Sequence, residues 1–273
     1  MALRIQNNVE AFNAHRNLTN VSEKVSQSME RLSSGYRINR AADDAAGLAI
    51  SEKMRAQING LDQAQRNAQD AVSLVSTAEG AMSEVHAMLQ RVRELAVQYN
   101  NGTLSSSDKT AIEDEVSQLG SEIDRIGTQT KFNGIALLTG STSINFQVGA
   151  ADGETLTVSA VPLYGSGSSF KVDSSLFSFS GTVNLSNIDT AIENVSTVRG
   201  TFGSTQNRLE HTINNLATFQ ENLQSSESRI RDVDMAAEMV NFTKLQILQQ
   251  AGTAMLAQAN TAPQAVLQLL HAQ

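Results

Sequence analysis

The chain has 273 residues, a formal net charge of −8 at pH 7, no cysteine and only 4% aromatic residues. The negative charge argues against binding to nucleic acid or an anionic membrane, which needs clustered basic residues. The absence of cysteine excludes a disulfide framework and thiol chemistry. No apolar run reaches the roughly 18 residues of a membrane-spanning helix, so we expect no membrane insertion. The first residues, Met1–Asn8, carry no apolar segment, so we expect no cleaved signal peptide.

Residues 3–32 show the spacing of an amphipathic helix. Apolar residues recur at intervals of three, four, six and seven, which suit one face of a helix: Ile5, Val9, Phe12, Leu18, Val21, Val25 and Leu32. The periodicity stops at Ser33–Gly35, where Gly35 can take the left-handed conformation that ends a helix. Asn39 or Asp43 is expected to cap the next helix, and Asp43 and Asp44 suit its positive N-terminus. Arg37 and Arg40 lie near these carboxylates in sequence, so the segment reads as a polar hinge with surface ion pairs.

A longer helix is predicted after the hinge. Its apolar seam keeps the three-four spacing without a slip, which is typical of a coiled-coil-like rod: Leu61, Ala64, Ala68, Ala71, Val75, Ala78, Met82, Val85, Leu89, Val92 and Ala96. Asn100–Gly102 ends this helix, and Ser105–Asp108 offers caps for the next one. Because the connection is short, the two helices should be antiparallel.

The period changes from Phe132 onward. Two alternating segments, centred on Phe146 and Val158, flank the turn residues Ala151–Gly153 and predict a β-hairpin. Shorter alternations at residues 170–185 suggest one or two more strands. These strands are too few for a separate domain, and we expect them to cap the rod.

Helical spacing returns at Ile188 and continues to Ile230. The following stretch differs, because Lys244 is the only formally charged side chain between Met239 and Leu270. Apolar residues and amides share every face there, whereas a surface helix normally keeps charges on one side. We therefore expect neighbouring chains to surround this helix. Its apolar residues are Phe242, Leu245, Leu248, Met255, Leu256, Val266 and Leu269.

The chain carries no pattern of a known catalytic or cofactor site. The four histidines are far apart, and no His-Glu-x-x-His, glycine-rich phosphate loop or Gly-x-Ser-x-Gly sequence occurs. We expect no enzyme activity, no metal and no cofactor.

Three motifs resemble those of bacterial flagellins. Leu32–Ile50 resembles their N-terminal signature, Gln90–Val97 resembles a motif of the long helix, and Ser228–Ala236 with Gln249–Gly252 and Ala262–Leu267 resembles their C-terminal motifs. The resemblance covers about residues 1–140 and 185–273. It implies a structural protein that polymerises into the flagellar filament for swimming.

The resemblance implies a mainly α fold. Residues 1–44 would form the N-terminal filament-core helix and hinge, 45–140 the rod helices, 141–184 the small β-hairpin region, 185–234 the rod return helix and 235–273 the C-terminal filament-core helix. The result would be a long antiparallel helical rod with a hairpin region at one end and a terminal helix pair.

The resemblance also implies partners and location. The partners are other copies of the chain, an export chaperone on the C-terminal helix, and the hook-filament junction and cap proteins. The location is an extracellular filament, reached by export through the flagellar type III apparatus. Arg91, Leu95 and Glu115 match the positions at which some flagellins contact the mammalian flagellin-sensing Toll-like receptor, and would serve the bacterium in subunit packing. A hook-filament junction protein is the alternative function, since it would share the terminal motifs, although the Gln90–Val97 motif argues against it.

Overall fold

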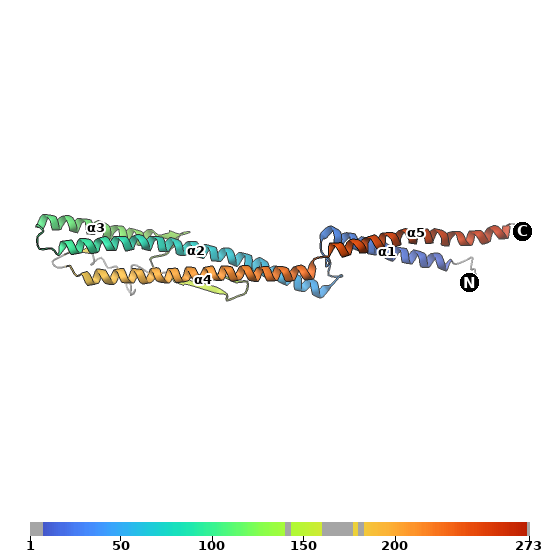
Figure 1. The fold of residues 1–273 in the computed structure, drawn as a ribbon, viewed down its shortest axis with the longest axis horizontal. Coiled ribbons are helices and arrows are strands. Elements are labelled where there is room, and N and C mark those ends of the chain that lie inside the picture. The colour runs from blue at the N-terminus through green and yellow to red at the C-terminus, as the bar shows by residue number, and fades with distance from the viewer. Residues whose placement is uncertain (1–7, 140–142, 160–176, 180–182, 272–273) are drawn as a thin grey trace. The chain divides into compact units, whose positions relative to one another are not determined.

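The computed structural model describes residues 8–139, 143–159, 177–179 and 183–271, with Ser159 and 262–271 described by their backbone alone. Five helices account for most of this chain: α1 (Val9–Ser34), α2 (Ala45–Tyr99), α3 (Ser106–Gln129), α4 (Leu185–Arg231) and α5 (Met235–His271) (Figure 1). The residues form two compact units, which we describe separately. The terminal unit comprises residues 1–56 and 222–273, and the rod unit comprises residues 57–221.

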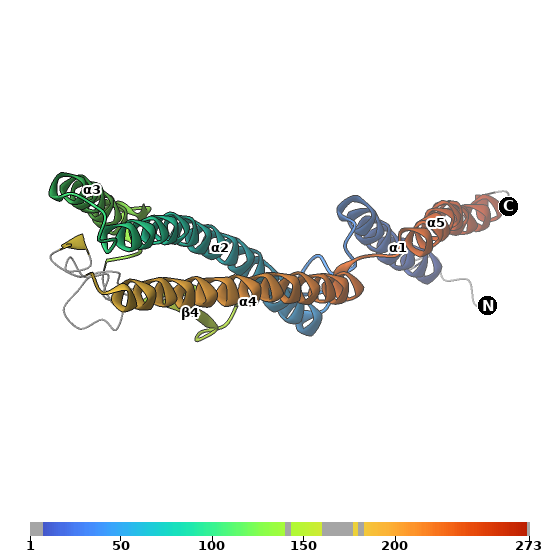
Figure 2. The ribbon, with the colours of Figure 1, turned by 60° about the vertical axis from the view of Figure 1, so that its left-hand side comes forward.

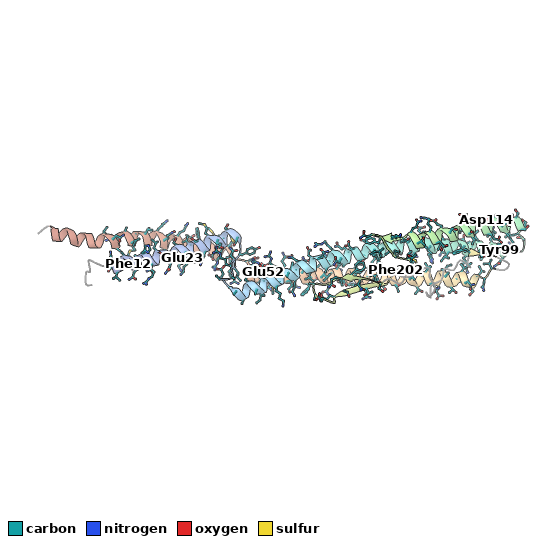
Figure 3. All side chains as sticks on the ribbon, turned by 180° about the vertical axis from the view of Figure 1, so that it is seen from behind. Phe12, Glu23, Glu52, Tyr99, Asp114 and Phe202 are labelled. Atoms are coloured by element: carbon teal, nitrogen blue, oxygen red, sulfur yellow. The ribbon has the colours of Figure 1, made fainter. Side chains whose placement is uncertain are left out.

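The seam of α2 forms the core of the rod unit. All eleven predicted seam residues from Leu61 to Ala96 are buried, together with Leu74, Leu95 and Tyr99, and the predicted three-four spacing is confirmed. Buried residues of α3 and α4, including Ile123, Val195 and Leu209, belong to the same core. Figure 3 labels Phe202, one of the buried α4 residues, midway along this unit. The mainly α fold with coiled-coil-like packing is therefore confirmed.

The turn from α2 to α3 forms one end of the rod unit. Ser105 caps α3 through a reciprocal pair of bonds with Asp108, as the sequence predicted. The Tyr99 hydroxyl donates to Glu113 over 2.7 Å, and the Tyr99 ring centroid lies 5.3 Å from that of Phe179. Tyr99 and Asp114 mark this end in Figure 3. Segment 177–179 thus lies against the α2–α3 turn.

Helix α3 is much shorter than α2 and is followed by short β-strands. At about 1.5 Å per residue, 24 residues of α3 span about 36 Å, well short of α2. The chain then forms β1 (Lys131–Phe132) with β2 (Ile135–Ala136), and β3 (Ser143–Gln147) with β4 (Thr155–Ser159). Both pairs are antiparallel, and Ile144 pairs with Val158 in the second. The predicted hairpin around Ala151–Gly153 is confirmed.

The position of the hairpin differs from the predicted cap. The Asn67 amide donates to the Gln147 carbonyl over 3.0 Å, and a Cβ on Gly60 would lie 3.1 Å from Ala150. The β3–β4 pair therefore lies beside the first part of α2 in the rod unit, away from the α2–α3 turn. The β1–β2 pair was not predicted. Its turn, Asn133–Gly134, has positive φ at both residues, the conformation for which Asn-Gly is favoured.

The strands suggested between 170 and 185 are not present where the structure describes this stretch. Residues 177–179 and 183–184 form no strand, and Leu185 begins α4. Asn100 fixes the start of α4 instead, because its side-chain amide donates to the Val183 carbonyl and accepts from the Val183 N–H. Residues 170–176 lie outside the described chain.

In the terminal unit α1 and α5 run side by side and antiparallel, in both Figure 1 and Figure 2. The Asn8 amide donates to the Ala259 carbonyl near one end of the pair, over 2.7 Å. The Ser28 hydroxyl donates to the buried Glu238 carboxylate near the other end. Among the described helices, none has a stretch apolar enough and long enough to cross a membrane.

Candidate assembly surface

The seam between α1 and α5 repeats every seven residues. On α1 the inward positions are Ala11, Ala14, Leu18, Val21, Val25, Ser28 and Leu32, and on α5 they are Glu238, Phe242, Leu245, Gln249, Gly252, Leu256 and Ala259. Their spacing alternates strictly between three and four, as in a two-stranded coiled coil. Most of these positions are only half-buried, because two helices alone cannot enclose each other.

The outward faces of the pair carry many exposed apolar side chains. Phe12, which Figure 3 labels on α1, is 71% exposed, and Val240 on α5 is 72% exposed. The other large exposed apolar residues of the pair are Val9, Met29, Met235, Met239, Ile247, Leu248 and Met255. In a soluble protein such a concentration of apolar surface marks an interaction site. This surface, which we call the apolar face, lies on both helices.

The apolar face is grooved rather than flat. One groove of about 800 Å³ runs beside the seam and is lined by both helices, including Leu18, Val21, Leu248, Gly252 and Met255. Gly252 keeps the helices close there, since a Cβ at this position would lie 3.3 Å from Leu18 Cδ1. A second groove of about 390 Å³ lies near the buried Glu238. Grooves of this kind accept side chains from another helix.

The sequence-predicted filament-core residues divide into three groups in this structure. Leu245 is buried, while Leu18, Val21, Val25, Leu32, Phe242 and Leu256 are half-buried in the α1–α5 seam. Val9, Phe12, Leu248 and Met255 are exposed. Ile5 and the side chains of Val266 and Leu269 lie outside the described part of the chain.

The hinge between α1 and α2 joins the link between α4 and α5. Gly35 ends α1 in the left-handed conformation, with φ of 76°, as predicted. The Arg37 N–H donates to the Arg231 carbonyl over 2.6 Å, and the Val233 N–H donates to the Gly35 carbonyl over 3.0 Å. The two connections therefore form a short antiparallel contact that holds the base of the α1–α5 pair.

The caps of the hinge differ from the prediction. Asp44, rather than Asn39 or Asp43, caps α2, because its carboxylate accepts from the Gly47 N–H over 2.9 Å. Asp43 accepts from the N–H groups of Arg40 and Asn39 and closes the turn before the helix. These bonds, led by that from Arg40, lower the pKa of Asp43 below its ordinary value of 3.8.

The hinge arginines find other partners than the predicted aspartates. Arg40 pairs with Glu30 at 3.0 Å, and the Arg37 guanidinium donates to the Ile230 carbonyl over 2.5 Å. Two further residues, Ile38 and Arg231, hold the hinge and were not predicted. Ile38 is 1% exposed, and Arg231 pairs with Glu52 at 2.6 Å while its guanidinium lies 4.8 Å from the Tyr36 ring centroid. Ile38 is the one branched aliphatic residue within the polar segment 33–44, and this was the available signal for its burial.

The three residues of the predicted receptor patch lie near one another on α2 and α3. Arg91 Nε donates to Glu115 over 2.9 Å, and the same guanidinium binds Glu94 over 3.1 Å. The bond to Glu115, and then that to Glu94, raise the pKa of Arg91 above its ordinary value. Leu95 differs from both, because it is 2% exposed and belongs to the core with Val92 and Ala96. The side chains of Arg91 and Glu115 are therefore accessible in this chain and that of Leu95 is not.

The chain matches two family profiles. Residues 5–143 match the bacterial flagellin N-terminal helical region, and residues 185–270 match the bacterial flagellin C-terminal helical region. It is 53% identical over 269 residues to a flagellin of Halalkalibacterium halodurans, covering 97% of this chain and 99% of that protein. It is 46% identical over 303 residues to a flagellin of Bacillus subtilis, covering 98% and 100%. It is 45% identical over 288 residues to the flagellar filament 33 kDa core protein of Treponema phagedenis, covering 97% and 99%.

Proposed function

The chain belongs to the bacterial flagellin family and is a structural subunit of the flagellar filament, and we propose that its copies assemble through the apolar face of the α1–α5 pair. The relatives named as flagellins or filament core proteins give no support to a hook-filament junction protein. The observation that carries the proposal is the exposure of the apolar residues on α1 and α5, from Phe12 to Met255.

The contrast between the two units supports this assignment. The rod unit closes its own core, with Val75, Leu89 and Leu209 fully buried. Among the described side chains of the terminal unit, only two large apolar ones, Ile38 and Leu245, are nearly enclosed. Other copies of the chain would bury the exposed apolar side chains if each α1–α5 pair contacts its neighbours through different faces. Such head-to-tail contacts generate a helical filament.

We propose that the terminal helices become stably ordered only on assembly. An isolated helix is only marginally stable in water. A seam that is half-buried gains little free energy from burial, and this gain offsets only a small part of the entropic cost of ordering the two helices. Neighbouring subunits that bind only the folded pair would stabilise it by mass action. In this proposal, segments 1–44 and 235–273 form the filament core, while 45–140, 141–184 and 185–234 form the rod with its hairpin region.

A pair of substitutions tests the apolar face. Val240→Glu places a charge on α5 at a position that is 72% exposed in the single chain, and Ile135→Glu does the same in the rod unit at a position that is 42% exposed. Val240→Glu should abolish elongation of filament seeds, because a buried unpaired charge is costly. Ile135→Glu should elongate normally. Electron microscopy and sedimentation of seeded reactions give the readout.

Either of two results contradicts the proposal. One is normal elongation by Val240→Glu, and the other is equal loss of elongation in both variants. Far-UV circular dichroism of the two monomers serves as the control, since both should retain the melting transition of the rod unit.

We propose that the same surface serves the partners met before assembly. An export chaperone bound to α5 would cover the apolar face while the chain awaits the flagellar type III apparatus, and an unfolded terminus would suit a narrow channel. The cap protein and the hook-filament junction proteins would meet the α1–α5 pair at the two ends of the extracellular filament. Lack of charge on α5 beyond Lys244 supports a partner that is largely apolar.

For the mammalian receptor we propose contact through Arg91 and Glu115, which are exposed. Leu95 would act indirectly, by packing beneath the helix surface. The same exposed pair would lie at a contact between subunits, so that the receptor would recognise the monomer rather than the filament.

A further inference from the structure

The described methionines differ in exposure: four are exposed, Met54 and Met88 on α2 are half-buried, and Met82 is buried. Met29, Met235, Met239 and Met255 are 55%, 48%, 50% and 65% exposed, and all lie on α1 or α5. Met82, in the rod core, is 1% exposed. The exposed thioethers thus sit on the surface that the proposed function assigns to assembly.

Two of these methionines line grooves of the apolar face. Met255 lines the 800 Å³ groove beside the seam, next to Leu248 and Gly252. Met239 lines a smaller groove with Val240 and Ile247. Both side chains are therefore open to small solutes in the single chain and surrounded by apolar neighbours that another subunit would cover.

We propose that these four methionines are oxidation sites that make assembly sensitive to peroxide. The inference rests on the proposed function, because it requires the apolar face to be buried in the filament. The thioether sulfur donates an electron pair to one oxygen of hydrogen peroxide, the O–O bond breaks, and a sulfoxide and water are formed. The sulfur loses two electrons and the peroxide gains them, so the reaction needs no other reagent.

Oxidation changes the fit of the surface. Methionine sulfoxide is polar, whereas the thioether is a flexible apolar group that fills irregular gaps. Burying the sulfoxide oxygen among apolar side chains without a hydrogen-bond donor is unfavourable. The free subunit therefore reacts and joins the filament less readily, while a subunit within the filament is shielded by its neighbours.

The test uses the full chain and hydrogen peroxide. Peptide mass spectrometry of the treated monomer should show rapid oxidation at the four exposed methionines and oxidation slower by about tenfold or more at Met82, which is almost fully buried. The treated monomer should require about a tenfold higher concentration to elongate seeds, equivalent to about 1.4 kcal/mol. In preformed filaments Met239 and Met255 should oxidise several-fold more slowly than in the monomer.

Matched variants separate this effect from general damage. For the variant Met29→Leu, Met235→Leu, Met239→Leu, Met255→Leu, elongation is compared before and after peroxide, and peroxide should not lower it from the variant's own untreated level. Met82→Leu should stay as sensitive to peroxide as the wild-type chain. Treatment with methionine sulfoxide reductases should restore elongation by the oxidised wild-type chain.

The outcomes distinguish this inference from the proposed function. If the untreated chain fails to elongate seeds, the proposed function is wrong. If the untreated chain elongates and the oxidised chain elongates equally well, the peroxide inference alone is overturned. Equal oxidation rates at Met239 in monomer and filament would show that this part of the apolar face stays open on assembly, and would contradict the proposed function together with the inference that rests on it.

Discussion

Two glycines on neighbouring helices give opposite expectations for the same substitution. Gly80, on α2, has no heavy atom within 4 Å of an added Cβ. Gly120, on α3, has Phe177 Cγ at 2.6 Å from that position. Alanine in place of glycine stabilises a helix by about 0.5–1 kcal/mol, and this gain is common to both sites. Overpacking adds a cost of about 1–3 kcal/mol only at Gly120, where the base of the Phe177 ring must move.

Gly120→Ala should therefore be less stable than Gly80→Ala by about 1–3 kcal/mol. In a unit of this size each kcal/mol shifts the melting temperature by about 2–4 °C, so the two variants should melt about 2–12 °C apart. Gly80→Ala should also melt above the wild-type chain. Thermal unfolding of the purified monomers, followed by far-UV circular dichroism, measures both shifts. Equal melting temperatures for the two variants would refute the packing of segment 177–179 against α3.

Three further expectations concern the core, the hinge and the receptor patch. Leu209→Ala should lower the free energy of unfolding by about 2–5 kcal/mol, since Leu209 is fully buried; an unchanged urea midpoint would contradict this. The lowered pKa of Asp43 means that its carboxylate stabilises the hinge above pH 3.8 and loses this effect as the pH falls through the lowered pKa. Filaments of Asp43→Ala should thus dissociate at a lower temperature than wild-type filaments at neutral pH, with the difference shrinking in strong acid. Arg91→Ala should weaken both motility and receptor signalling in reporter cells, and full signalling by its monomer argues against the patch.

The rod seam could be predicted because a single rule governs it. From Leu61 to Ala96 every position of the three-four repeat is apolar and buried, and the central positions share one core with residues of α3, α4 and β4. The burial of Leu95 was missed because the repeat widens near its end, where Leu95 joins Ala96 and Tyr99 in the core. Leu95 is buried because α3 packs on that side of α2, and the α2 sequence alone does not reveal this contact.

The hinge was harder to predict because its contacts join residues far apart in the chain. Asp43 and Asp44 are equivalent as capping residues in sequence, and only the turn closed by the Arg40 and Asn39 N–H groups assigns the cap to Asp44. Arg231 pairs with Glu52 across most of the chain length. Local patterns carry no information about such pairs.

For the terminal helix pair, the need for neighbouring chains could be predicted but the seam between α1 and α5 could not. The unusual lack of charge on α5 predicted neighbours of the same kind, and the exposed apolar face agrees with that prediction. The heptad seam with α1 was obscured because its α5 positions include Glu238, Gln249 and Gly252 alongside apolar residues. The α5 residues that face α1 can be distinguished from those of the apolar face only once the pairing of the two helices is known.

Amide hydrogen exchange on verified monomer and on filament tests the central claim most directly. If the apolar face is the assembly surface, the amides of α5 from Glu238 to Leu256 should exchange rapidly in the monomer and about a hundredfold or more slowly in the filament. The amides of Ala64–Ala96 in the rod core should be protected in both states, which provides the internal reference. Slow exchange of Glu238–Leu256 in the monomer, unchanged on assembly, would contradict the account.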